Sequence, residues 1–71
     1  MTRKEYNGCV DKHADAVYRF ILKACHNKAL ADDIVQDSFL ALWENVSVIT
    51  CEKAKSFLFT TAYRKMIDTF R

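Results

Sequence analysis

The 71-residue sequence has no proline and a single glycine, Gly8. Glycine and proline favour tight turns, so a sequence with almost none of them has few positions at which a β-hairpin can turn. The three cysteines, Cys9, Cys25 and Cys51, are an odd number without a C-x-x-C pair, which argues against a disulfide framework. Apolar residues still make up 51% of the chain, more than a disordered chain carries. The sequence therefore predicts an all-α fold in one small domain, residues 1–71.

Two further absences restrict the function. The opening residues, MTRKEYNGCVDKHAD, lack the apolar core of a signal peptide, and no apolar run approaches the length needed to cross a bilayer. We therefore expect a cytoplasmic protein without a membrane partner. A chain this short leaves little room for an enzyme cleft, and one glycine cannot supply a glycine-rich phosphate loop. We expect no catalytic residue and no enzyme activity.

A metal site has some candidate ligands but no evident geometry. Cys9 and His13 lie four residues apart, and Cys25 precedes His26 directly. Structural zinc needs four converging donors, and nothing in the sequence shows that the two pairs converge. A buried free cysteine on an apolar stripe is also ordinary, and Cys25 lies on such a stripe. We expect no metal and no cofactor.

Charge of each sign is collected in blocks. Residues 1–28 carry six basic and three acidic side chains, residues 29–51 carry no basic and four acidic ones, and residues 52–71 carry five and two. An acidic middle segment suits a basic protein surface, while a basic final segment suits a polyanion. The distribution does not name either partner.

Apolar residues at steps of three and four predict three helices. The first covers about Val10–Cys25, the second Lys28–Asn45, and the third starts at Cys51 or Glu52 and continues to the end. We expect residues 1–9 to be a flexible lead-in, unless they add a helical turn that makes the bundle four-helical.

The same pattern predicts caps and faces. Asn27 and Thr50 suit the N-caps of the second and third helices, and the run 47–50, which is β-branched at three of its four positions, predicts a short connector. In the first helix the stripe consists of Val10, Ala14, Val17, Ile21 and Ala24. The third helix has two stripes, one of Ala54, Phe57, Leu58, Thr61, Ala62 and Met66, the other of Phe59, Tyr63, Ile67 and Phe70. The second stripe predicts contact with a partner or with further chain.

The second helix is amphipathic and acidic. Its apolar stripe consists of Ile34, Val35, Phe39, Leu42, Trp43 and Val46, and its other face of Asp33, Gln36, Asp37, Ala41 and Glu44. This face has two interpretations. It is either solvated, with Asp32 and Asp33 near the helix start complementing the macrodipole, or it binds a basic surface.

The order of residues in this helix carries a resemblance. Residues 33–43 read DIVQDSFLALW and resemble the D-[LI]-V-Q-[ED]-[TS]-F-L-x-L-W signature of bacterial sigma factors, in region two of the extracytoplasmic-function (ECF) group. Residues 27–29 occupy the place of the family's helix-opening turn. Residues 57–64, FLFTTAYR, followed by Ile67-Asp68, resemble the family's W-L-F-T-I-A-R-N and I-D. The resemblance covers about Ala14–Arg71.

The resemblance implies a non-catalytic subunit of RNA polymerase. In this family the acidic helix binds the clamp helices of the largest subunit of core polymerase. By position the contacts would be Asp33, Gln36 and Asp37, with Phe39 and Trp43 as packing or interface aromatics; for Trp43 the core is the favoured place. The resemblance also implies control by an anti-sigma factor.

For the third helix and the loop that leads into it, the resemblance implies a second partner, promoter DNA. In the family they bind the non-template strand of the minus-ten promoter element and hold the DNA open. Carried over by position, the loop is Val48–Lys53 and Lys55, Ser56, Thr60, Tyr63 and Arg64 line the strand. The further basic residues are Lys53, Lys65 and Arg71. Basic side chains contact phosphates and aromatic faces stack on unpaired bases. The alternatives are a solvated basic face, and core positions for Phe57 or Phe59.

The sequence departs from the family at several positions. Phe57 replaces the usual tryptophan, Tyr63 stands where many members have arginine, and Arg64 where many have asparagine. ECF sigma factors also continue into a second helical domain that reads the minus-thirty-five element. We expect that domain to be absent, so that this chain is either a domain fragment or a truncated product. A different class of function stays open, a small helical interaction module that binds a basic protein and does not contact DNA.

Overall fold

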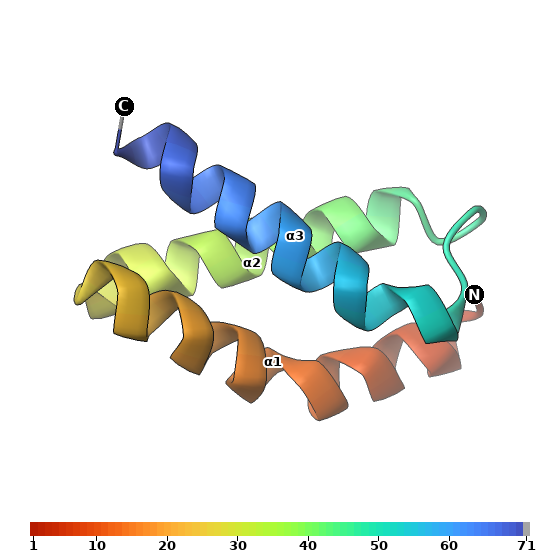
Figure 1. Ribbon diagram of the computed structural model, residues 1–71. Helices are drawn as coiled ribbons and strands as arrows, with labels where there is room; N and C mark the ends of the chain where they lie inside the picture. The colour runs from red at the N-terminus through yellow and green to blue at the C-terminus, as the bar shows by residue number, and fades with distance from the viewer. Residues whose placement is uncertain (71) are drawn as a thin grey trace.

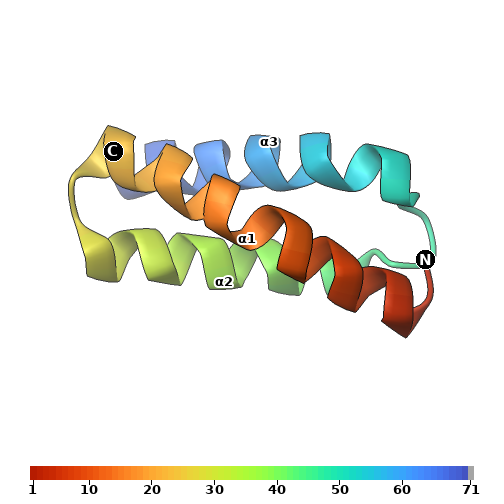
Figure 2. The same cartoon turned by 90° about the horizontal axis from the view of Figure 1, so that it is seen from below.

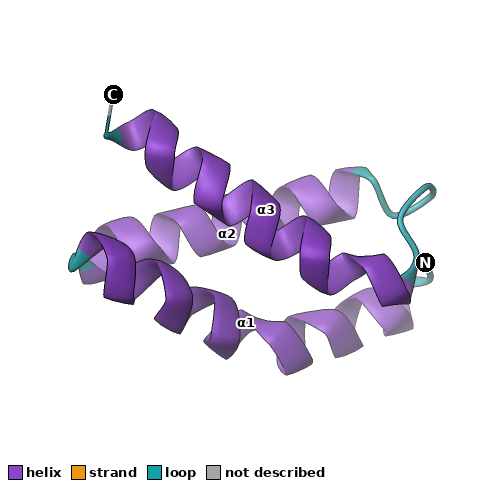
Figure 3. Cartoon of the chain, viewed as in Figure 1, coloured by secondary structure: helices purple, strands orange, loops and turns teal. Residues whose placement is uncertain are grey.

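Three helices, α1 (Arg3–Cys25), α2 (Lys28–Glu44) and α3 (Cys51–Thr69), make up most of the computed structural model, which describes residues 1–70 (Figure 1). Successive helices run in opposite directions, and each packs against both others (Figure 2). No described residue lies in a strand (Figure 3). The all-α fold and the three-helix count are confirmed for this part of the chain.

The start of α1 differs from the prediction. The helix begins at Arg3, not near Val10, so most of the predicted lead-in is its first two turns. Thr2 and Glu5 form a capping box: the Glu5 amide donates to the Thr2 hydroxyl at 3.1 Å, and the Thr2 amide donates to Glu5 Oε1 at 2.9 Å. The T-x-x-E pattern is the sequence signal for this helix start. The residues add no separate fourth helix.

Two residues make the turn between α1 and α2. His26 adopts a left-handed conformation with φ of 55°, and its amide donates to the Leu22 carbonyl at 2.8 Å, which ends α1. Asn27 then caps α2, because its side-chain oxygen accepts from the Leu30 amide at 3.0 Å. The predicted Asn27 cap is confirmed. A turn this short keeps α1 and α2 antiparallel neighbours.

The connection from α2 to α3 follows the prediction apart from the side-chain bond of its cap. α2 ends at Glu44, one residue before the predicted limit, and α3 begins at Cys51. Thr50 occupies the N-cap position, but its side chain makes no capping hydrogen bond; only its carbonyl takes part, accepting from Lys53 at 3.1 Å. The predicted N-cap position of Thr50 is therefore confirmed, although its side chain forms no capping bond.

The core receives one stripe from each helix. On α3 the predicted stripe is confirmed at four of its six positions, with full burial at Ala54, Leu58 and Ala62 and near-complete burial at Met66, whereas Phe57 and Thr61 are half-buried. On α1 the buried residues are Cys9, His13, Val17 and Ile21. The predicted α1 stripe is thus right at Val17 and Ile21 only, since Val10 and Ala14 lie half-buried at the core edge and Ala24 is exposed.

On α2, two residues differ from the predicted stripe. Ser38 is fully buried between Ile34 and Leu42, and its hydroxyl donates to the Ile34 carbonyl at 2.7 Å. This bond satisfies the hydroxyl within the helix, so a polar residue can occupy the core. Trp43 is 44% exposed, so the prediction that it is a core residue is wrong. Phe39, at 7% exposure, packs in the core.

The N-terminus of α1 is fastened to the connection between α2 and α3 (Figure 1). The Met1 nitrogen donates to the Val46 carbonyl at 2.8 Å. The Tyr6 hydroxyl donates to the Phe39 carbonyl at 3.0 Å. These contacts join residues more than thirty positions apart and close the bundle at this end.

Burial of α2 predicts a difference between two leucines. Leu42→Ala should lower the free energy of unfolding by about 2–5 kcal/mol, because it leaves a cavity at a fully buried side chain. Leu40→Ala makes the same change at a side chain that is 56% exposed and should cost about 0.5 kcal/mol or less. Chemical denaturation followed by circular dichroism measures both. Equal losses would contradict the orientation of α2.

Candidate functional site

The outward face of α2 carries the predicted acidic set. Asp33, Gln36, Asp37 and Leu40 share one side of the helix, since each lies three or four residues from another member of the set. They lie opposite the buried Ile34, Ser38 and Leu42, and all four are exposed. Glu44 continues this face by one turn and is also exposed. Within residues 1–70, the polar groups of Asp33, Gln36 and Asp37 form no hydrogen bond or ion pair with other side chains. Their oxygens are free to accept from arginine or lysine.

Stabilisation by the helix dipole does not explain the position of these carboxylates. α2 begins at Lys28, and its first turn contains no acidic residue. Asp32 and Asp33 come after that turn, beyond the distance over which the dipole acts strongly. The interpretation of this face as merely solvated therefore no longer has the helix dipole to explain its carboxylates, although the exposure of these side chains agrees with it.

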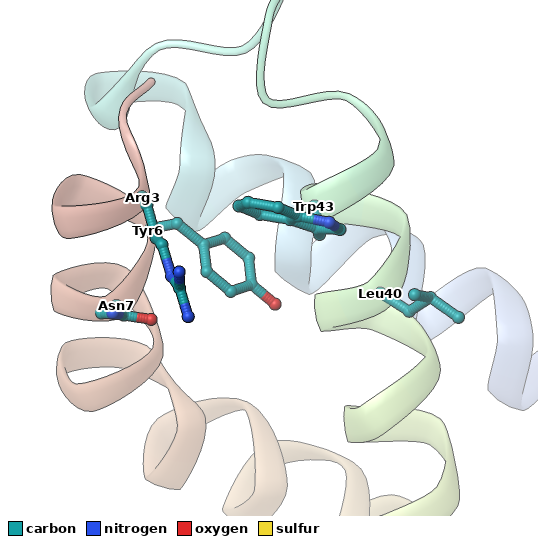
Figure 4. A pocket seen from close by; sticks show the side chains of 5 residues that line it. All are labelled: Arg3, Tyr6, Asn7, Leu40 and Trp43. Carbon is teal, nitrogen blue, oxygen red and sulfur yellow. The ribbon is translucent and has the colours of Figure 1, made fainter.

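A surface hollow of about 400 Å³ adjoins the acidic face where α1 passes α2 (Figure 4). It is lined by Arg3, Tyr6 and Asn7 from α1 and by Leu40 and Trp43 from α2. Tyr6 packs edge-on against Trp43, with ring centroids 5.0 Å apart. The sequence interpretation missed Arg3 and Tyr6, because it placed them in the lead-in; the capping-box pattern was the available signal.

The outward face of α3 brings together four of the predicted strand-binding residues. Lys53, Ser56, Thr60 and Arg64 line a groove of about 370 Å³ together with Ile49, Phe57 and Thr61. We call this the outer groove. Its residues recur at steps of three and four, opposite the buried stripe of α3. It therefore offers two cations and three hydroxyls beside the apolar side chains of Ile49 and Phe57. Val48, in the leading loop, is 75% exposed.

The remaining predicted residues do not line the outer groove. Tyr63 lies beside it, 50% exposed, and borders a smaller hollow with Arg64, Ile67 and Asp68. Lys65 is half-buried. Arg71 lies outside the described residues. The predicted set is thus only partly one surface.

Lys55 faces α1. Burial lowers the pKa of His13, and the positive charges of Lys12 and Lys55 lower it further. Lys55 must therefore be close to His13 in the bundle, because a charge so exposed to solvent acts only at short range. This places Lys55 at the α1–α3 contact and outside the outer groove.

Aromatic side chains cover the contact between α1 and α3. The Phe20 ring lies edge-on to Phe59 at 5.3 Å and tilted to Tyr63 at 6.5 Å between centroids. Phe20 itself is 41% exposed. The second predicted stripe of α3 therefore contacts α1 on one side while its Tyr63 and Phe70 remain exposed. Sequence reasoning did not identify Phe20, which lies off the predicted stripe of its helix.

The described residues, 1–70, contain no group of three His, Cys, Asp or Glu side chains that could hold a metal ion. Nor does any helix among them combine the length and apolar character that a membrane span requires.

Comparison with known proteins gives a family match and curated relatives. Residues 9–71 match the family described as Sigma-70 region 2. The ECF RNA polymerase sigma factor SigL of Mycobacterium tuberculosis is 36% identical over 63 residues, covering 86% of this chain and 36% of SigL. SigM of Bacillus subtilis, also named an ECF sigma factor, is 34% identical over 55 residues, covering 78% and 34%. The chain thus spans about a third of the length of these relatives. No solved structure matches.

The position of Lys55 can be tested through His13. Removing the positive charge in Lys55→Gln should raise the pKa of His13, because protonation no longer meets that repulsion. Lys53→Gln, the same change in the outer groove, should leave it unaltered. NMR titration of the His13 ring from pH 4 to 8 measures both.

The same shift sets a pH dependence of stability. The pKa of folded His13 lies below its ordinary 6.5, so the fold has its full stability above about pH 6.5 and loses some as the pH falls through the folded-state pKa. His26→Asn, which keeps a residue suited to the left-handed cap, is the control and should not alter this loss. In the NMR titration described above, an unchanged pKa of His13 in the Lys55→Gln variant would contradict the placement of Lys55 near His13.

Proposed function

The chain belongs to the sigma-70 region 2 family, and on that premise we propose that it supports transcription initiation by binding core RNA polymerase and opened promoter DNA. In this proposal α2 binds the clamp helices of the largest polymerase subunit, and α3 with its leading loop binds the non-template strand of the minus-ten element. The role is one of binding and positioning and includes no catalysed reaction.

The acidic face of α2 supports the polymerase contact. Its two aspartates and its glutamine are exposed along one side of a rigid helix, at spacings that let neighbouring oxygens accept from one arginine fork. Because residues 29–51 contain no basic residue, this part of the chain contributes only negative charge to the face. Such a surface selects a basic partner and speeds its association.

The hollow beside this face supplies apolar contact area. Trp43 and Leu40 are 44% and 56% exposed, and Tyr6 holds the tryptophan ring in place from α1. Partly exposed tryptophan at the centre of a surface patch is a common anchor in protein interfaces. We therefore include Trp43 in the proposed polymerase surface, whereas Phe39 contributes by packing in the core and orienting the helix.

The outer groove supports the DNA contact. Lys53 and Arg64 lie eleven residues apart along α3 and can contact separate phosphates of one strand, while Ser56 and Thr60 offer hydroxyls between them. Tyr63 exposes half of its surface next to Arg64, so an unpaired base can stack on its ring. Asp68 borders the same hollow and would disfavour a phosphate there.

One observation carries the proposal: the acidic set and the basic groove are outward faces of different helices, each opposite its own buried stripe. A protein and a nucleic acid can therefore bind at the same time without sharing side chains. A protein that covers α2, such as an anti-sigma factor, would exclude polymerase by occupying the same acidic face.

The polymerase contact predicts a charge-reversal effect. The double variant Asp33→Arg/Asp37→Lys should weaken capture of core polymerase by about 2 kcal/mol or more, roughly thirtyfold, because it replaces acceptors by like charges. Affinity is measured by surface plasmon resonance with core polymerase. The control, Asp11→Arg/Asp15→Lys, makes the same change in charge on α1, where the Asp15–Arg19 pair is exposed and contributes little. If the parent and the α2 variant bind core polymerase with equal affinity, the proposed contact between α2 and polymerase is wrong.

The DNA contact predicts separate effects of charge and ring. With core polymerase present, Arg64→Ala and Lys53→Ala should each reduce the slope of log affinity on log salt by roughly 1, because each removes one phosphate contact. Tyr63→Ala should weaken binding of the single non-template strand more than of duplex. Fluorescence anisotropy at several salt concentrations measures both effects.

Lys28→Ala is the matched control for the DNA experiment, since Lys28 is the first residue of α2 and does not line the outer groove. Lys55→Ala tests the sequence-based assignment of Lys55 to the DNA strand, because Lys55 does not line that groove. One outcome would favour the alternative function. If the α2 variants weaken polymerase binding but none of the α3 variants changes DNA binding, the chain is an interaction module that does not contact DNA.

A further inference from the structure

Two of the three free cysteines lie where α1 meets the beginning of α3. Cys51 is the first residue of α3 and is exposed, whereas Cys9 belongs to the buried stripe of α1. The third, Cys25, ends α1 at the opposite end of that helix, and its thiol donates to the Asn27 carbonyl at 3.5 Å. The chain therefore contains a pair and a separate third cysteine.

Glu5 shows how close the pair is. The Cys51 thiol donates to Glu5 Oε2 at 3.1 Å. Glu5 and Cys9 are four residues apart on α1, which makes them neighbours on one helix face. The Cys51 sulfur thus lies over the turn of α1 that ends at Cys9. The hydrogen bond to Glu5 raises the pKa of the Cys51 thiol, and the nearby Cys9 side chain makes a smaller contribution in the same direction.

We propose that Cys9 and Cys51 form a reversible oxidative modification site, in which a peroxide converts the two thiols to a disulfide that joins α1 to α3. Cys51 is the residue that reacts first, because it is the exposed member of the pair. Cys9, buried next to it, resolves the product. The inference does not depend on the proposed function.

The chemistry balances with one peroxide for each disulfide. The Cys51 thiolate attacks a peroxide oxygen, so an S–O bond forms, the O–O bond breaks, and the departing hydroxide takes a proton to become water. The Cys9 sulfur, on losing its proton, then attacks the Cys51 sulfur; the S–S bond forms and the S–O bond breaks, releasing a second water. The two thiols give up two electrons, which reduce the peroxide. An added dithiol reverses the reaction by exchange.

The disulfide has a structural consequence. It replaces the Cys51–Glu5 hydrogen bond by a covalent link between residues 42 positions apart, and so restricts the unfolded chain. The start of α3, where the leading loop ends, can then no longer separate from α1. Because the hydrogen bond to Glu5 holds the Cys51 proton, reaction with peroxide should be slow compared with that of an activated thiol.

The test treats the 71-residue chain with hydrogen peroxide and counts the remaining thiols. The parent and Cys25→Ser should each lose two thiols and 2 Da, and trypsin should release residues 5–12 linked to residues 29–53. The oxidised chain should melt roughly 10 °C higher than the reduced one, and dithiothreitol should restore the lower value. Cys51→Ser, at an exposed position where folding is not at risk, should form no intramolecular disulfide.

The results that would overturn the inference are equally distinct. They are a disulfide that includes Cys25, a dimer linked through Cys51, or oxidation of Cys51 to sulfinic acid without linkage to Cys9. Retention of all three thiols, under conditions that oxidise the denatured chain, would overturn it as well. Cys25→Ser is the matched control throughout, because it removes a free thiol without touching the pair.

Discussion

One fully enclosed stripe on each helix fixes the arrangement of everything else in this bundle. Ile21, Leu42 and Leu58 have no exposed surface, and they come from three different helices that share one core. Small residues such as Ala54 and Ala62 let the helices approach closely, so α3 cannot rotate without exposing leucine or enclosing a charge. Because each stripe faces inward, the opposite face of each helix must face solvent. The acidic and basic surfaces are therefore consequences of the same packing.

The second constraint is the junction at the N-terminus of α1. Tyr6 reaches from α1 to the Phe39 carbonyl and packs on Trp43, while Glu5 caps its own helix and accepts from Cys51 at the start of α3. One helical turn thus contacts both other helices. Three features depend on this turn: the hollow beside the acidic face, the position of the start of α3, and the cysteine pair. A fold with residues 1–9 unfolded would have none of the three.

Local spacing and side-chain chemistry were sufficient for three features of the fold. They predict the helix count, the Asn27 cap and the buried positions Ala54, Leu58, Ala62 and Met66 of α3, and the structure has them as predicted. Trp43 and Lys55 could not be placed in this way, because their surroundings come from α1: Tyr6 for the tryptophan, His13 for the lysine. Hydropathy favours burial for tryptophan, but it does not show which helix covers each side of the ring. The same reason explains why the candidate DNA set was only partly one surface.

Separation of charge by helix has an energetic consequence for binding. The carboxylates of Asp33 and Asp37 have no intramolecular counter-ion among the described residues, whereas Asp15 is already paired with Arg19. A basic partner that contacts Asp15 must compete with an existing pair, so part of its interaction energy is offset. At α2 the partner displaces only water, and each charge-assisted bond adds to the affinity in full apart from desolvation. The unpaired face is therefore the one from which a docking partner gains most, even though both faces are equally open to solvent.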